Sequence, residues 1–333
     1  MIDVAILGAS GFVGAELLRL CVGHPSLRAA RLFADSQAGA SVAEAHPHLA
    51  PAYGAARFEP WSPASLKGVP LVFAALPHGE SQKIAASILD SGAKFVDLGA
   101  DFRLSEASDY EKWYGEAHGA PDLLDRFVYG IPELNRTAIA KADAVAAAGC
   151  YPTATILALK PLLPLIDRAT IVVNAASGVS GAGKALKENT HFNTVDENFT
   201  AYGLLNHRHT AEMEMALGVN ILFTPHLAPM NRGILATCTA RAKGPCDPLA
   251  ALALAYENEP FIHVSETPPS TKWTLGSNAV HLTARYDERT GNVLAIAALD
   301  NLVKGAAGQM IQCANLMLGL DESAGLTNVG VWP

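Results

Sequence analysis

Short apolar runs alternate with helical patterns along the first half of the chain. Residues 4–7 and 71–76 are apolar runs of strand length, and residues 81–91 repeat their apolar positions at helical spacing. Three more strand-type runs complete the series, at residues 29–34, 95–98 and 144–148. Strands that alternate with helices are typical of a parallel, doubly wound sheet, so this half predicts an α/β fold.

The second half has strand-type runs with few helices between them. These runs occupy residues 171–175, 220–224, 233–242, 281–286 and 293–300, and a polar hairpin sequence at 287–292 joins the last two. A largely antiparallel sheet with helices on one face is the expected result. Residues 302–318 then predict a long, largely apolar closing helix.

A chain of 333 residues is too long for one small core, and the change of pattern predicts two domains. We expect a first domain at residues 1–149, completed by the C-terminal segment 302–333, and a second domain at residues 150–301. Residues 103–134 are less periodic, and we interpret them as a surface excursion that carries a small helix.

Composition narrows the classes of partner. The net charge of −8 argues against nucleic acid or an anionic membrane, although local arginines can still bind an anionic substrate. No basic stretch leads into an apolar signal region, and no apolar span reaches about 18 residues, so we expect no membrane partner. The five cysteines lack paired metal-ligand spacing, so we expect no metal site, no disulfides and a reducing cytoplasm.

A glycine motif follows the first strand and opens a helix. Gly8-Ala9-Ser10-Gly11-Phe12-Val13-Gly14 lies between an apolar strand run and a helix-type sequence. Glycines at such a turn let the backbone approach a pyrophosphate, which then lies on the helix N-terminus. The motif predicts a dinucleotide site, and Pro77 at the end of a later strand should line the same cleft.

A single cysteine occupies a second turn between a strand run and a helix. Cys150 follows the run at residues 144–148 and Gly149, and it precedes a helix-type sequence. The helix dipole and nearby N–H groups would favour its thiolate, which is the nucleophilic form. The alternative is a buried cysteine that acts as a small hydrophobe. Together with a nicotinamide site, a nucleophilic Cys150 predicts capture of an acyl group as a thioester that hydride reduces to an aldehyde.

Other polar side chains are candidates for the same chemistry. His207, His209 and Glu212 lie within six residues, and a histidine has the pKa range of a proton donor; the alternative is a solvated polar turn. His226 lies in a loop between two prolines. The prolines could hold the loop rigid for a binding site, or they could simply end strands. Arg103 could bind a carboxylate or phosphate, or form a salt bridge with Asp101.

Nine sequence blocks in order resemble the N-acetyl-gamma-glutamyl-phosphate reductases of arginine biosynthesis. They occur at residues 8–14, 75–79, 97–104, 129–135, 149–153, 177–183, 207–209, 224–227 and 300–309. The resemblance implies a Rossmann-type domain and an α/β catalytic and oligomerising domain, similar to aspartate-semialdehyde dehydrogenase. It also implies NADP as cofactor, Cys150 as nucleophile and His209 as acid/base, with His207 as the other candidate.

The resemblance further implies a set of binding residues and partners. Cofactor contacts are expected from Gly8, Ser10, Gly11, Phe12, Val13, Gly14, Ser36, Gln37, Pro77, Ser177, Gly178 and Asn301, and substrate contacts from Arg103, Tyr151, Ser180, Glu212 and His226. The implied substrate is N-acetyl-L-glutamyl 5-phosphate, the products are its 5-semialdehyde and phosphate, and the implied assembly is a homotetramer.

Two alternative activities and the choice between NAD and NADP stay open. The chain could be a sister enzyme for carrier-bound aminoadipyl phosphate, or a nucleotide-sensing protein without catalysis. Asp35 lies about 20 residues beyond the glycine motif, where an acid usually binds a ribose 2′-hydroxyl and disfavours a 2′-phosphate. Use of NADP therefore requires Asp35 to turn away, which leaves Ser36 and Gln37 for the phosphate.

Overall fold

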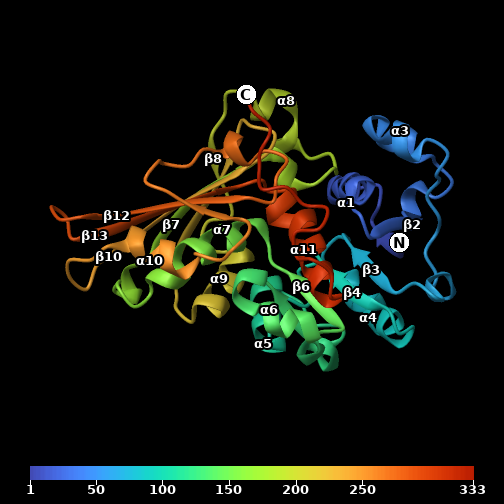
Figure 1. The fold of residues 1–333 in the computed structure, drawn as a ribbon, viewed down its shortest axis with the longest axis horizontal. Helices are drawn as coiled ribbons and strands as arrows, with labels where there is room; N and C mark the ends of the chain where they lie inside the picture. The colour runs from blue at the N-terminus through green and yellow to red at the C-terminus, as the bar shows by residue number, and fades with distance from the viewer. The chain divides into compact units, whose positions relative to one another are not determined.

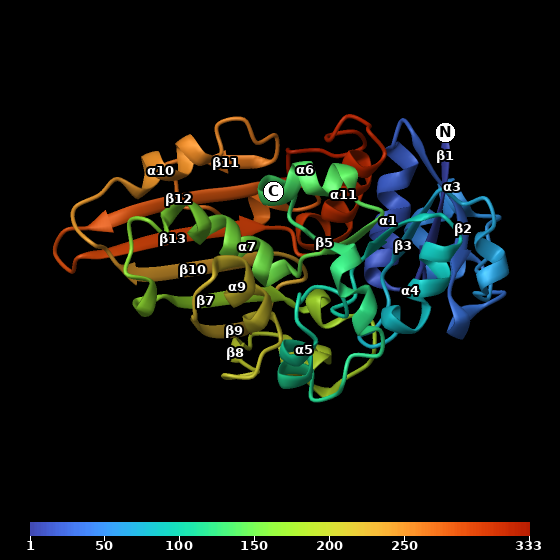
Figure 2. The same cartoon turned by 90° about the horizontal axis from the view of Figure 1, so that it is seen from below.

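A computed structural model describes residues 1–333, which divide into two compact units. Unit 1 comprises Met1–Ala148 and Ala306–Leu326, and unit 2 comprises Gly149–Gly305 and Thr327–Pro333. The last seven residues of the chain thus belong to the second unit. Figures 1 and 2 trace both units. None of the helices has the length and apolar character that a membrane span requires.

Unit 1 is built on a six-stranded sheet in which every neighbouring pair is parallel. Its order is β2 (Leu27–Phe33), β1 (Ile2–Leu7), β3 (Leu71–Ala74), β4 (Lys94–Asp97), β6 (Ala144–Ala147) and β5 (Phe127–Gly130). The predicted Rossmann-type sheet is therefore confirmed. The excursion expected at residues 103–134 contains the small helix, but it also supplies β5, whose four residues are too few for a clear periodic signal.

The helices of unit 1 are α1 (Phe12–Gly23), α2 (Val42–Ala45), α3 (Ala50–Tyr53), α4 (Ser81–Asp90), α5 (Ala107–Tyr114), α6 (Pro132–Lys141) and α11 (Gly308–Met317). Alternate residues of the strands point to opposite faces of the sheet. Ile6 and Phe73 pack in one core with α1 and α11, whereas Leu7 and Val72 pack in another with α4. This burial on both faces explains why the strands appear as continuous apolar runs.

Unit 2 contains a seven-stranded mixed sheet. Its order is β11 (Ile262–Val264), β12 (Val280–Asp287), β13 (Asn292–Leu299), β10 (Ile234–Arg241), β7 (Val172–Gly178), β9 (Leu222–Ala228) and β8 (Thr200–Ala201). The pairs β11–β12 and β7–β9 are parallel and the others antiparallel, as expected for a mainly antiparallel sheet.

Four helices accompany this sheet: α7 (Cys150–Leu159), α8 (Phe192–Val195), α9 (His209–Leu217) and α10 (Pro248–Ala255). Figure 1 shows α7, α9 and α10 on one side of the sheet, which agrees with the predicted arrangement. The closing helix predicted at 302–318 is interrupted, because Val303–Ala307 forms a π-helical turn before α11. Such turns often occur near functional sites.

Candidate active site

Cys150 is the first residue of α7, directly after the N-cap residue Gly149. No side chain caps this helix, and the positive end of its dipole favours a thiolate at its first residue. Cys150 is partly exposed. Cys21 and Cys238 are buried, and burial raises the pKa of each thiol to about 12. The surroundings of Cys150 therefore suit a reactive thiolate, and those of Cys21 and Cys238 do not.

Gly305 lies against the nucleophile from the π-helical turn. A Cβ at this glycine would lie 2.6 Å from the Cβ of Cys150 and 3.1 Å from its Cα. Ordinary carbon atoms in contact are separated by about 3.5–4.0 Å. The absence of a side chain at Gly305 is therefore required for Cys150 to occupy its position.

Glu212 links the turn at Cys150 to the candidate acid/base. Its side chain is fully buried, and Oε2 accepts a hydrogen bond of 3.1 Å from the backbone N–H of Gly149. Its Oε1 lies 3.9 Å from Nε2 of His209, the first residue of α9. The expected substrate-binding residue Glu212 thus contacts the backbone before the nucleophile and the histidine one turn away.

His207 occupies a different environment from His209. Burial, together with the positive charge of the nearby Arg208 guanidinium, lowers the pKa of His207 to about 4. Its Nδ1 accepts a hydrogen bond of 3.2 Å from the backbone N–H of His209. A neutral ring that accepts at Nδ1 carries its proton on Nε2. At neutral pH His207 is therefore uncharged, and it fixes the backbone at the start of α9.

Tyr151 packs against aromatic side chains beside the nucleophile. Its ring meets His207 and His209 edge to face, with ring centroids 5.6 Å and 5.9 Å away. Its hydroxyl donates to the backbone oxygen of His226 and accepts from Tyr202. Burial raises the pKa of Tyr202 to about 12, and negative charge at Cys150 raises it as well. These neutral phenols enclose the site without adding charge.

The predicted binding residues on and next to β7 and β9 belong to unit 2, as Cys150 does. Ser177 is buried beside Tyr151, and the His226 ring stacks on Phe199 at 5.0 Å. Ser180 accepts a 2.9 Å hydrogen bond from the side-chain amide of Asn301, whose oxygen accepts from the N–H of Gly233. A Cβ on Gly178 would lie 2.6 Å from the backbone oxygen of Asn231, so the loop between β9 and β10 packs directly on this glycine.

Unit 1 carries the glycine motif in the expected geometry. Gly8 has a φ of +77°, and a Cβ there or at Gly14 would overlap the neighbouring backbone. A Cβ at Gly11, the N-cap residue of α1, would meet only the Gly8 oxygen, at 3.4 Å. At Gly8 and Gly14 the motif therefore packs tightly against neighbouring backbone, whereas at Gly11 the N-terminus of α1 is open. A pyrophosphate needs such an open helix N-terminus. Ser10, Phe12 and Val13 lie in or beside this turn.

The remaining expected contacts of unit 1 lie after strand ends. Asp35, Ser36 and Gln37 form a short 3₁₀ turn after β2, and Oδ1 of Asp35 accepts a 2.9 Å hydrogen bond from the Trp61 backbone N–H. Pro77 follows β3 and is exposed. Arg103 is buried, and its guanidinium donates to the backbone oxygen of Leu98.

The structure adds two residues that the sequence did not single out. Tyr202 contacts the hydroxyl of Tyr151, and Gly305 makes room for Cys150. Neither position has a local pattern that distinguishes it from an ordinary tyrosine or glycine. Both act through segments more than 50 residues away in the chain, so only the tertiary structure reveals them.

Two family models match the chain. Residues 3–142 match the NAD binding domain of semialdehyde dehydrogenases, and residues 150–301 match their dimerisation domain. Among solved structures, aspartate semialdehyde dehydrogenase II from Vibrio cholerae has a TM-score of 0.72 at 18% identity and covers 96% of this chain and 98% of its own. A probable aspartate-semialdehyde dehydrogenase from Pseudomonas aeruginosa has a TM-score of 0.70 at 22% identity, with 95% and 98% coverage. These structures share the fold.

Curated relatives are similar over their whole length. Proteins named N-acetyl-gamma-glutamyl-phosphate reductase are 48% identical in Acidothermus cellulolyticus, with 99% of both chains covered, and 45% identical in Desulforudis audaxviator, with 100% of both chains covered. The resemblance inferred from nine sequence blocks is thereby confirmed, as is the nicotinamide-binding class of the first domain. This chain belongs to the N-acetyl-gamma-glutamyl-phosphate reductase family.

Proposed function

We propose that this chain is an NADPH-dependent reductase that converts N-acetyl-L-glutamyl 5-phosphate to N-acetyl-L-glutamate 5-semialdehyde and phosphate, a step of L-arginine biosynthesis. The observation that carries the chemistry is the partly exposed Cys150 at the uncapped start of α7, with the Glu212 carboxylate linking its turn to His209. The substrate follows from the shared family, whose curated members bear the name of this reaction.

Cys150 supplies the nucleophile. Its thiolate attacks the acyl carbon, the carbon–oxygen bond to phosphate breaks, and a thioester forms. The positive end of the α7 dipole would stabilise the oxyanion that develops at this carbon. Bound NADPH supplies the hydride that reduces the thioester. Collapse of the resulting thiohemiacetal breaks the carbon–sulfur bond, releases the aldehyde and restores the Cys150 thiolate.

His209 handles the proton at the reacting oxygen. The Glu212 carboxylate lies 3.9 Å from Nε2 and orients the ring, and an imidazole can serve as acid and then base, so His209 suits this role. His207 has a pKa of about 4, so at neutral pH its ring is not the imidazolium that could act as an acid. We therefore assign the acid/base role to His209 and a positioning role to His207.

The cofactor is held by the glycine turn of unit 1 and by neighbouring side chains. Gly11 leaves the N-terminus of α1 open, and Asp35 is engaged by the Trp61 N–H. With Oδ1 directed at the Trp61 N–H, Asp35 turns from the role of ribose ligand and leaves Ser36 and Gln37 as the candidate contacts of the NADPH 2′-phosphate. Pro77, Ser177, Gly178 and Asn301 are proposed as further contacts. We propose Arg103, Tyr151, Ser180, Glu212 and His226 as substrate-side residues.

The remaining proposals concern domains, assembly and location. We assign residues 1–149 with the closing helix to cofactor binding, and residues 150–301 to catalysis and assembly. A homotetramer is proposed from the family resemblance. A cytoplasmic location agrees with five cysteines that form no disulfide.

The test is an assay in the reverse direction. N-acetylglutamate semialdehyde, phosphate and NADP⁺ are supplied, and NADPH absorbance is followed. Cys150→Ser should lower turnover by at least about three orders of magnitude with NADP⁺ affinity unchanged, because serine is not ionised at neutral pH. Cys246→Ser is the matched control and should stay active, as should variants of the buried cysteines. A fully active Cys150→Ser enzyme contradicts the thioester mechanism, and activity only with carrier-bound aminoadipyl semialdehyde contradicts the substrate.

A further inference from the structure

A segment between β2 and β3 packs against the glycine turn of unit 1. Val42, Leu49 and Phe58 of this segment are buried in the same core as Ala9 and residues of α1. The Tyr53 hydroxyl also donates a 3.0 Å hydrogen bond to the backbone oxygen of Leu18 in α1. The segment is thus fixed to the helix that the glycine turn opens.

His46 makes the direct contact between this segment and the turn. Its side chain is buried, and Nε2 lies 3.0 Å from the backbone oxygen of Ala9. A carbonyl oxygen can only accept, so Nε2 carries the proton and donates it. The ring also packs edge to face against Phe58, with centroids 6.2 Å apart, which fixes its orientation.

This hydrogen bond determines how one peptide plane of the turn is oriented. The backbone N–H groups of Gly8 and Ala9 both donate to the Phe33 oxygen, at 3.0 Å, which anchors the turn on its other side. In a planar trans peptide the carbonyl and the next N–H point in opposite directions. With the Ala9 carbonyl directed at His46, the Ser10 N–H must point away from His46.

The orientation matters because an anion needs N–H groups rather than carbonyl oxygens. A rotation of the peptide between Ala9 and Ser10 would turn a carbonyl oxygen to the side where the N–H now points. We propose that His46 is a positioning residue for the dinucleotide turn: by holding the Ala9 carbonyl, it keeps this oxygen from turning towards the side of the turn where the cofactor pyrophosphate would bind. This inference rests on the proposed use of a nicotinamide dinucleotide.

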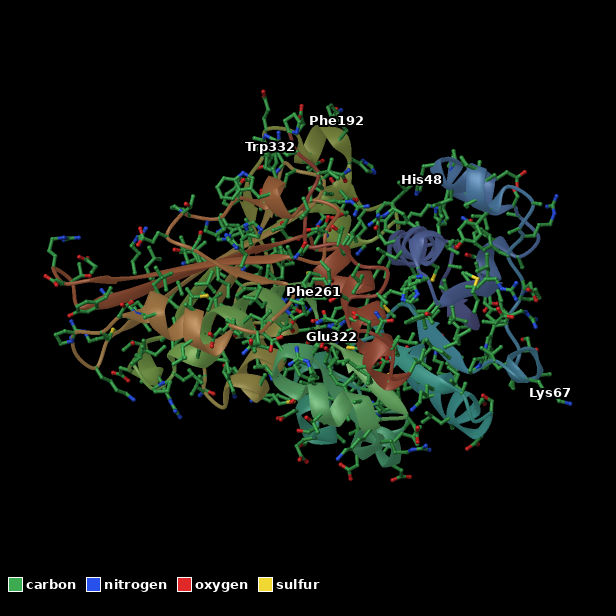
Figure 3. The ribbon with its side chains drawn as sticks, viewed as in Figure 1. His48, Lys67, Phe192, Phe261, Glu322 and Trp332 are labelled. Atoms are coloured by element: carbon green, nitrogen blue, oxygen red, sulfur yellow. The ribbon has the colours of Figure 1, made fainter.

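The test compares variants of two histidines that lie two residues apart. His46→Leu removes the donor, and His46→Gln retains an N–H donor at a similar reach. His48→Leu is the control, because His48 is exposed (Figure 3) and its ring lies beside that of His46 at 6.1 Å. Calorimetry measures NADP⁺ binding to each protein. Amide hydrogen exchange of residues 8–13 is followed without cofactor, and iodoacetamide alkylation of Cys150 reports on the second unit.

The loss of one buried hydrogen bond should raise the NADP⁺ dissociation constant about tenfold in His46→Leu. Exchange at residues 8–13 should be faster in that variant, while alkylation of Cys150 should be unchanged. His46→Gln and His48→Leu should bind NADP⁺ as wild type does. Equal affinity of wild type and His46→Leu overturns the inference, and so does weak binding by His46→Gln that matches His46→Leu.

Two further outcomes keep the result interpretable. If wild type itself fails to bind NADP⁺, the proposed function is wrong rather than the role of His46. If His46→Leu does not fold, long-range proton–nitrogen NMR of the wild-type histidine rings decides the question. A proton resident on Nε2 of His46 supports the inference, and one resident on Nδ1 with Nε2 bare overturns it.

Discussion

Adding one methyl group opposite the nucleophile should disable the enzyme. In Gly305→Ala the new Cβ would lie 2.6 Å from the Cys150 Cβ and 3.3 Å from Cδ1 of Leu299. Contacting carbons need about 3.5 Å or more, so Cys150 or the π-helical turn must move by about 1 Å. A displacement of about 1 Å in a reacting group can cost about a hundredfold in rate. Overpacking a buried site also costs about 1–3 kcal/mol in the free energy of unfolding.

We therefore expect Gly305→Ala to lower turnover about a hundredfold and to lower the free energy of unfolding by about 1–3 kcal/mol. The measurements are reverse-direction turnover, the rate of Cys150 alkylation by iodoacetamide, and urea unfolding. Gly244→Ala is the control, because nothing lies within 4 Å of a Cβ at Gly244. A Gly305→Ala enzyme with wild-type turnover and wild-type alkylation would refute the packing argument, since Cys150 would then tolerate the added methyl group.

Three other predictions address protons and the cofactor. His209→Asn should lower turnover far more than it raises the Michaelis constant. His207→Asn should lower turnover less, because His207 is neutral. Steady-state kinetics of both variants is the measurement, and equal losses of turnover would contradict the assignment. Asp97 is fully buried, and burial raises its pKa to about 7. Because the folded protein binds this proton more tightly than the unfolded chain, Asp97 contributes stability at pH values below the unfolded-state pKa. This contribution is lost as the pH rises through about 7. Between pH 5 and 8 wild type should therefore lose about 3 kcal/mol relative to Asp97→Asn in urea unfolding, and parallel pH curves would contradict this. Wild type should prefer NADPH over NADH at least about tenfold in kcat/KM. Asp35→Ala should maintain or strengthen this preference, because the Asp35 carboxylate is already hydrogen-bonded to the Trp61 N–H. A preference of wild type for NADH would instead make Asp35 the ribose ligand.

Most of the architecture could be predicted from local patterns. Strand runs such as residues 71–76 and 95–98 are buried on both faces of the sheet, so their apolar character is strong and continuous. The strand β5 was missed because four residues within a polar excursion carry little periodic information. The predicted closing helix included the turn at Val303–Ala307, because helix propensity does not distinguish a π-helical turn from an α-helix.

The fold class and the chemical type of the site could be inferred from local sequence patterns alone. A glycine turn after a strand and a cysteine at a helix start are local features, because each depends on a few consecutive residues. The contacts that hold these residues in place become visible only in the folded chain. Glu212 reaches Gly149 across 63 residues, His46 reaches Ala9 across 37, and Gly305 meets Cys150 from the far end of the second unit. Such contacts depend on how loops of irregular conformation bring distant segments together, and no local periodicity encodes that geometry.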